Sequence, residues 1–288
     1  MLTQRTVTVG LDGSPESLDA ADWGAREAQL RGLSLHLVHA SATPPHPRQP
    51  SASVSSADAA GTREQNVVDL ATLHLSYAHP SLGIIEEPVE GAPVPVLLSM
   101  AETSALLVLG SRGNSALTGL MVGSVARAVA ARAACPVALV RAGEQPQDER
   151  RGAHDAPYRP VLLGLDLERP CDELIEYAFG AAAVRRTSLH VLHAWTVPLA
   201  PSAAAEDPRV AKRVRMAAVL QSWEQKFPGT EVVREEVHGL AGHHLLKASA
   251  DASLLVVGRP AEAGPRLGPT AHSVIHHVLC PVVVVPHA

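Results

Sequence analysis

Aromatic side chains are scarce in this sequence. Phe, Trp and Tyr together make up 3% of the 288 residues, so the core has to be built from Val, Leu, Ala and Ile. Few aromatics also disfavour a platform on which nucleic-acid bases would stack. The formal net charge of −5 points the same way, because nucleic-acid backbones are bound through an excess of positive charge. We therefore expect no nucleic-acid partner.

Cysteines and long apolar runs are also few. The three cysteines, Cys135, Cys171 and Cys280, are far apart and lack Cys-x-x-Cys spacing, which disfavours a disulfide framework or a zinc site. No apolar run in the sequence approaches the ~18 residues needed to cross a bilayer. The first residues lack the apolar stretch of a secretion signal. These features predict a cytoplasmic protein with no membrane partner.

The chain contains one sequence pattern twice. An apolar run ends in aspartate at Asp12 and again at Asp166, an offset of 154 residues (166 − 12). A second run ends in His-Ala at Ala40 and at Ala194, with the same offset (194 − 40). Two further pairs follow in the same order: the runs that end in Gly110 and Gly258, and the runs that follow Cys135-Pro136 and Cys280-Pro281. Four pairs in one order indicate an internal duplication.

Segments with helical periodicity separate the apolar runs, as in Pro15–Arg31 and Pro170–Arg186. Ser14 before Pro15 is typical of an N-cap followed by proline at the first helical position. Strands that alternate with helices form parallel sheets wound on both faces, and apolar runs suit strands buried on both sides. The predicted fold class is α/β, with two tandem doubly wound parallel-sheet domains.

Composition also predicts where the domains begin and end. Residues 143–156 are polar and carry Glu-Gln-Pro-Gln-Asp-Glu-Arg-Arg, which is typical of a linker. We predict a first domain at residues 1–142, a linker at 143–157 and a second domain at 158–288. Residues 41–61 are rich in Pro, Ser and Ala, and we predict a long mobile loop there.

The strongest functional signal is a glycine-rich segment in the first half. Gly110 and Gly113 follow an apolar run, and Gly123-Ser124 stands nine residues further on, before a helix predicted over Val125–Ala134. A strand, a glycine-rich loop and a helix start can form a phosphate cradle, in which accessible backbone N–H groups and the positive end of the helix dipole face an anion. The alternative is a tight turn that binds nothing.

The Gly-x2-Gly-x9-Gly-Ser segment, Asp12 followed by Gly-Ser, and the closing Cys-Pro-Val-x-Leu-Val together resemble the universal stress protein family, in its tandem-domain, ATP-binding, actinobacterial form. The resemblance covers both halves of the chain. It implies domains of the adenine nucleotide alpha-hydrolase-like type, each with five strands in the order 3-2-1-4-5 and with ATP beside strands 1 and 4. That place is the switch point of a doubly wound sheet, where ligands are expected on topological grounds.

The resemblance also implies an architecture for the whole chain. The terminal strands, Val137–Arg141 and Val282–Pro286, are apolar edge strands that need covering. In this family such strands pair with each other, so the two halves would form an intramolecular pseudo-dimer. A further homodimer through another surface stays open.

Site residues in the first half follow from the same resemblance. Asp12 and Gly13 would contact the adenosine, and Ala40 would meet the adenine edge through its backbone. The ribose and phosphates would be wrapped by Gly110, Ser111, Arg112, Gly113 and Asn114, and the β- and γ-phosphates would be held by Gly123, Ser124 and Val125. The implied ligand is ATP, with Mg2+. From the residues alone, Asp12 could instead cap the next helix, and Arg112 could be a solvated surface arginine.

The second half departs from this pattern. Aligned on Cys280-Pro281, Gly268 falls where Gly123 falls, and the loop that ends there spans 10 positions (268 − 258) against 13 (123 − 110) in the first half. Pro269 replaces the serine and so removes a hydroxyl and a backbone N–H from the anion site. We predict one competent ATP site, in the first domain, and one degenerate site.

No motif of a dedicated enzyme accompanies the loop. The sequence lacks Gly-x4-Gly-Lys-Ser/Thr, and neither first strand is followed by Gly-x-Gly-x-x-Gly. The main hypothesis is a nucleotide-responsive regulatory protein of stress or dormancy, with an unidentified protein partner and no catalytic residue. Two alternatives stay open: a slow ATPase or phosphotransferase with an unknown substrate, and a dimeric scaffold that binds no nucleotide.

Fifteen histidines raise the question of a metal site. His36 and His39 lie three apart on a predicted strand, so their side chains point to opposite faces. His272 and His276 have ligand spacing on a predicted helix, but a third ligand is not evident in the sequence. We therefore predict solvated or packing roles for these histidines and no metal site.

Overall fold

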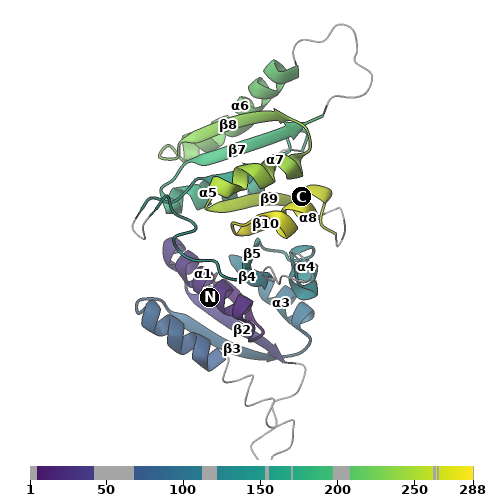
Figure 1. Cartoon of the computed structure of the whole chain (residues 1–288). Helices are drawn as coiled ribbons and strands as arrows, with labels where there is room; N and C mark the ends of the chain where they lie inside the picture. Colours follow the sequence, from purple (N-terminus) through teal and green to yellow (C-terminus); the bar gives the residue numbers. More distant parts are fainter. Residues whose placement is uncertain are drawn as a thin grey trace, which may run out of the picture. The chain divides into compact units, whose positions relative to one another are not determined.

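The structure is a computed structural model that describes residues 5–41, 68–111, 122–152, 156–169, 171–196, 208–261, 264 and 266–287. It divides into two compact units, Met1–Glu144 and Gln145–Ala288. In each unit the described residues form five parallel strands with helices on both faces of the sheet (Figure 1). The predicted α/β class, with two tandem parallel sheets, is confirmed.

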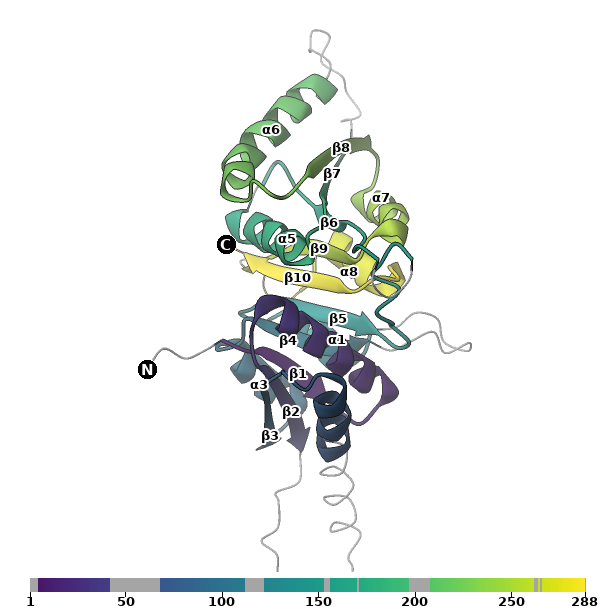
Figure 2. The ribbon, with the colours of Figure 1, turned by 90° about the vertical axis from the view of Figure 1, so that its left-hand side faces the viewer.

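The first unit has the strand order β3-β2-β1-β4-β5. Its strands are β1 (Val7–Leu11), β2 (Leu35–Ser41), β3 (Ile84–Glu90), β4 (Leu106–Ser111) and β5 (Val137–Arg141). Its labelled helices are α1 (Pro15–Arg31), α3 (Pro93–Ala101) and α4 (Ser124–Ala130), and residues 68–78 also lie in a helix. Helices α3 and α4 pack against each other on one face of the sheet, and α1 packs on the other (Figure 2).

Burial explains why the sequence pattern predicts these segments. The central strands β1 and β4 are covered on both faces, and Val7, Val9 and Leu107 are fully buried. Helix α1 begins where the Ser14 side chain accepts a hydrogen bond from the Ser17 N–H, and it ends at Gly32, whose φ of 64° is left-handed. The predicted bounds of this helix are confirmed.

The second unit repeats this order as β8-β7-β6-β9-β10. Its strands are β6 (Val161–Gly164), β7 (Leu189–Trp195), β8 (Val232–His238), β9 (Leu254–Pro260) and β10 (Val282–His287). Its helices are α5 (Asp172–Arg185), α6 (Pro208–Lys226), α7 (Ala241–Ala248), the short 3-10 helix η1 (Ser249–Asp251) and α8 (Pro269–His277). Both units therefore have the predicted 3-2-1-4-5 order.

Residues that composition assigns to a linker pack onto the second unit. Arg150 and Tyr158 form an antiparallel bridge, and the Arg150 guanidinium carbon lies 4.1 Å from the centre of the Tyr158 ring. The buried carboxylate of Glu149 lies 3.8 Å from the buried guanidinium of Arg185 in α5. Glu149 and Arg150 of the predicted linker therefore contact the second unit, whereas the Gly143 N–H donates to Asp19 Oδ2 in the first unit (2.7 Å).

The structure corrects some predicted elements. The helix expected over Val125–Ala134 is α4, which begins one residue earlier and ends at Ala130. The third strand of each unit was missed, because β3 and β8 are edge strands with many solvent-exposed residues and so lack an apolar run. Residues 42–61 of the predicted loop lie outside the described residues. The domain boundaries, the internal pseudo-dimer and the homodimer stay predictions.

In the part of the chain that the structure describes, no helix combines the length and the apolar character that a membrane span requires.

Candidate functional site

The carboxyl ends of β1, β2 and β4 meet at one edge of the first sheet. β2 pairs with one side of β1 and β4 with the other, so the chain crosses to the opposite side of β1 between these strands. Such a switch point leaves a crevice outside the strand ends, where doubly wound proteins bind ligands. The predicted site residues that the structure describes all lie at this edge or at the start of α4.

Asp12 holds the turn that leads from β1 into α1. Its Oδ1 accepts hydrogen bonds from the Ser14 N–H (3.0 Å) and the Ser14 hydroxyl (2.5 Å). Packing around the carboxyl raises the pKa of Asp12, but hydrogen bonds from Ser14 and Ser17 outweigh this and leave the pKa below its usual value. Gly13 has a φ of 80°, a left-handed conformation that favours glycine. Asp12 therefore has a structural role, whatever it contributes to a ligand.

Ala40 lies at the carboxyl end of β2, next to a histidine that ties two strand ends together. The Nδ1 atom of His39 lies 2.9 Å from the Leu11 carbonyl oxygen at the end of β1. In the second unit the Nδ1 atom of His193 lies 3.0 Å from the Leu165 carbonyl oxygen, which is the equivalent contact. The sequence analysis did not predict this contact, and the repeated His-Ala pair was the available signal for it.

Gly110 and Ser111 end β4, and packing within the unit explains both residues. A Cβ atom at Gly110 would lie 2.6 Å from the Glu16 carbonyl oxygen in the first turn of α1. The hydroxyl of buried Ser111 donates a hydrogen bond to the Val140 carbonyl oxygen (3.1 Å). Glycine at position 110 is thus required by the close approach of α1, so it cannot be assigned to anion binding from its residue type alone.

Gly123, Ser124 and Val125 form the start of α4. Gly123 is the N-cap, with extended backbone (φ −57°, ψ 152°) and no side chain to cap the first-turn N–H groups. A Cβ atom at Gly123 would meet no atom of the described residues within 4 Å. Among the described residues, no atom therefore blocks the approach of a ligand to the helix start at this point. Arg112, Gly113 and Asn114 lie outside the described residues.

The second unit has the same backbone at its strand ends but different groups. Asp166 Oδ1 accepts a hydrogen bond from the Glu168 N–H (2.9 Å), as Asp12 does from Ser14. Gly268 is the N-cap of α8 with φ −62° and ψ 163°, nearly the values of Gly123, which supports the alignment of these two glycines. Pro269 is then the first residue of the helix and lacks an N–H to offer.

Reactive-thiol chemistry is not favoured at Cys135 or Cys171. Burial raises the pKa of the Cys135 thiol to about 11, as it does for Cys171, where a hydrogen bond to Glu173 adds to the shift. Thiols with such values stay protonated near neutral pH. Within the described ranges, no three His, Cys, Asp or Glu side chains come together in a way that could hold a metal ion.

Two tandem five-stranded domains of this strand order define an α/β protein built on doubly wound parallel sheets. A model of the universal stress protein family matches residues 4–141 and 157–286, which is both units. The chain belongs to the universal stress protein family, as its motifs predict.

Relatives of known sequence span the whole chain. Universal stress protein Rv2005c of Mycobacterium tuberculosis is 31% identical over 292 residues, which cover 98% of this chain and 97% of that protein. Universal stress protein Rv1996 of the same species is 29% identical over 314 residues, covering 98% and 95%. The tandem arrangement is therefore shared with these mycobacterial proteins.

Solved structures match as well. A universal stress protein from Archaeoglobus fulgidus is 18% identical, covers 99% of each chain and has a TM-score of 0.70. A universal stress protein crystallised in complex with cAMP is 29% identical over 48% of this chain, with a TM-score of 0.36. At 18% identity, the match over the full length bears on the fold alone.

Proposed function

We propose that the first unit binds ATP, with Mg2+, at the carboxyl edge of its sheet, and that the bound nucleotide controls the surface offered to a regulatory protein partner in the cytoplasm. The second unit binds nucleotide weakly. The observation that carries this proposal is the convergence of three strand ends and the start of α4 at the switch point of a universal stress protein domain.

Each described residue of the site has a place in this proposal. Asp12 and Gly13 face the adenosine from the turn after β1, and the backbone of Ala40 meets the adenine edge from the end of β2. The backbone of Gly110 and Ser111 leads into the loop that wraps the ribose and phosphates, to which Arg112, Gly113 and Asn114 belong. The β- and γ-phosphates lie at Gly123, Ser124 and Val125. The space beside Gly123 and its lack of a capping side chain support this assignment.

The sharpest test starts from the purified full-length chain. Heating the protein and separating the released small molecules by chromatography identifies any nucleotide that co-purifies with it. Isothermal titration of the nucleotide-free chain with Mg–ATP then gives the stoichiometry, which we expect to be one ATP per chain. A chain that carries no nucleotide and gives no heat with Mg–ATP would refute the proposal and leave the scaffold alternative.

A further inference from the structure

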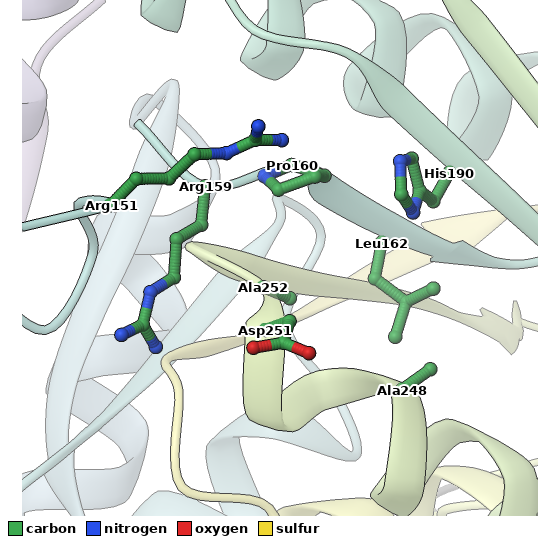
Figure 3. A pocket seen from close by; sticks show the side chains of 8 residues that line it. All are labelled: Arg151, Arg159, Pro160, Leu162, His190, Ala248, Asp251 and Ala252. Carbon is green, nitrogen blue, oxygen red and sulfur yellow. The ribbon is translucent and has the colours of Figure 1, made fainter. Parts of the chain in front are cut away.

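A cavity of about 300 Å3 lies at the amino edge of the second sheet, where the strands begin (Figure 3). Leu162 of β6, His190 of β7 and Ala252, just before β9, contribute to its lining. Its size is at the lower end of the roughly 300–1,000 Å3 that small-molecule sites occupy. The nucleotide-binding edge of this fold is the other end of the strands, so this cavity is a different place on the unit.

The floor of the cavity is apolar. Pro160, Leu162 and Ala252 are buried, and Ala248 at the end of α7 completes this surface. In Figure 3 the Leu162 side chain points towards Ala248 across the space between them. A ligand with an apolar body would gain about 25 cal/mol for each Å2 of apolar surface that it removes from water here.

Comparison with the first unit explains why space exists here. The Ser253 N–H donates to the Pro160 carbonyl (2.9 Å), as the Ala105 N–H donates to the Thr6 carbonyl (2.8 Å). These matched bonds place Leu162, Ala248 and Ala252 at the positions that Thr8, Met100 and Ser104 hold in the first unit.

The first unit fills these positions with longer or hydrogen-bonded groups. The Thr8 and Ser104 hydroxyl oxygens lie 2.7 Å apart, and the Ser104 hydroxyl donates to the Met100 carbonyl oxygen (2.7 Å). In the second unit alanine stands in place of both Met100 and Ser104. The cavity is therefore bordered by two side chains that are shorter than their counterparts.

Positive charge surrounds the mouth of the cavity. Arg151 and Arg159 line it together with Asp251, so two positively charged residues and one carboxylate border the cavity. The backbone N–H of Arg151 donates to the Pro157 carbonyl (3.0 Å), and the Arg159 guanidinium donates from Nε to the Arg150 carbonyl (3.0 Å) and from Nη1 to the Ala250 carbonyl (3.1 Å). These bonds fix the backbone at Arg151 and the side chain of Arg159, and they use two of the five N–H donors of the Arg159 guanidinium.

His190 adds a polar side chain to the lining of the cavity. Desolvation and the positive charge of Arg151 lower the pKa of this imidazole, against a smaller opposing effect of Glu235 and Glu231. A neutral imidazole can donate or accept a hydrogen bond. In the first unit the equivalent residue is His36, and its Nε2 atom lies 2.8 Å from Oε2 of Glu87.

We propose that this cavity binds a small organic carboxylate with an apolar body. Arg151 and Arg159 bind the carboxylate, because a planar guanidinium matches its two oxygens. The apolar body lies against Leu162 and Ala248, and Asp251 is positioned to accept a hydrogen bond from a donor on the ligand. The site needs no nucleotide in either unit.

The test uses the full-length chain and four probes of one shape: phenylacetate, phenyl phosphate, benzyl alcohol and benzylamine. Ligand-observed NMR and isothermal titration measure their binding with and without saturating Mg–ATP. We expect phenylacetate to bind best and ATP to leave its affinity unchanged. Displacement of phenylacetate by ATP, or stronger binding of phenyl phosphate or of either probe without an anionic group, would overturn the assignment.

Two variants and one control locate the binding. Ala248→Met inserts the residue that the first unit carries at this position and is expected to abolish phenylacetate binding. Arg151→Gln, at an exposed position, is expected to weaken it roughly 10- to 100-fold, the usual worth of a charge-assisted hydrogen bond. Arg169→Gln removes an exposed arginine outside the cavity lining and should change nothing. Unchanged affinity in both Ala248→Met and Arg151→Gln, or no phenylacetate binding by the wild-type chain, would refute the proposal.

Discussion

The two units place nearly the same backbone at the start of their last helix but present different atoms there. Gly123 and Gly268 are both extended N-caps without a capping side chain, and a Cβ atom at either would meet no described atom within 4 Å. Ser124 then offers a hydroxyl and an N–H, whereas Pro269 offers neither. A duplicated fold can thus keep the shape of a ligand site after losing its hydrogen-bond donors.

The two units also differ at the amino edge of their sheets, where the strands begin. There the first unit fills its interior with hydrogen-bonded hydroxyls at Thr8 and Ser104, while the second unit has Leu162 and Ala252 at these positions and a cavity beside them. The two units therefore differ at both ends of their strands: in hydrogen-bond donors at the carboxyl edge and in the side chains that fill the amino edge.

The largest expected effect comes from a carboxylate placed at the start of α4. Gly123→Asp should weaken ATP binding at least about 100-fold, because a negative charge is brought directly against the phosphates. The open space at Gly123 lets the side chain fit without unfolding the unit. Gly268→Asp is the matched control in the second unit and should leave the tight site intact. Isothermal titration of both full-length variants measures this, and tight binding by Gly123→Asp would contradict the phosphate assignment.

A smaller effect is expected from returning a serine to the second unit. Two charge-assisted hydrogen bonds lost at Pro269, at about 1.5–3 kcal/mol each, weaken its site by roughly two orders of magnitude or more. The test uses a Gly123→Asp background, in which the first site no longer binds ATP tightly. There Pro269→Ser should raise the ATP affinity of the second unit only about tenfold, because the shortened loop remains. Titration with Mg–ATP compares the double variant with Gly123→Asp alone. Equal affinity of the two chains would show that proline is not the cause.

Alanine substitutions at two glycines of the first unit should differ in their effect on the free energy of unfolding. At Gly110 a Cβ atom would lie 2.6 Å from the Glu16 carbonyl oxygen, so Gly110→Ala should cost about 1–3 kcal/mol of unfolding free energy. Gly123→Ala meets no such contact and should cost only a few tenths of a kcal/mol. Urea unfolding followed by the fluorescence of Trp23, with Trp195 and Trp223 replaced by Phe, reports the first unit. Equal midpoints for the two variants would mean that α1 can move away from β4.

Much of the fold could be predicted because its central strands are buried on both faces. Runs such as those around Val9 and Val108 stay apolar for that reason, and α1 was delimited by Ser14 and Gly32. The edge strands β3 and β8 were missed because solvent reaches them, so their sequences mix charged and apolar residues. The local pattern of apolar and polar residues therefore indicates which strands are buried, not which strands pair with each other.

The sites were predictable only where they depend on local sequence. The turn at Asp12 and Gly13 lies within a few residues of chain, whereas the contact of His39 with the Leu11 carbonyl joins residues 28 positions apart. The reason for glycine at position 110 lies in α1, which is almost a hundred residues away. The cavity of the second unit depends on Ala248 and Leu162, which come together only once the sheet has formed. The repeated His-Ala pair is the sequence signal for the His39 contact, whereas the packing at Gly110 and the cavity leave no periodic or motif signal.

The smallest expected effect concerns the charge of Asp12. Its folded-state pKa is lowered, so its contribution to stability is present above the unfolded pKa of about 3.9 and is lost as the pH falls through the folded value. Asp12→Asn keeps an oxygen that accepts from the Ser14 N–H but removes the charge near the first turn of α1. At neutral pH this should cost a few tenths to about 1 kcal/mol, because the exposed carboxylate is screened by water.

Urea unfolding at pH 7 and at pH 3 separates the charge from the turn geometry. The difference between the wild-type chain and Asp12→Asn should shrink at pH 3, where the carboxylate is increasingly protonated. Ser14→Ala is a companion variant: the carboxylate keeps its charge and the bond from the backbone N–H, but a donor to Oδ1 and the hydrogen bond that caps α1 at the Ser17 N–H are both lost. A difference that stays constant between the two pH values would mean that the shape of the turn, and not its charge, stabilises the end of β1.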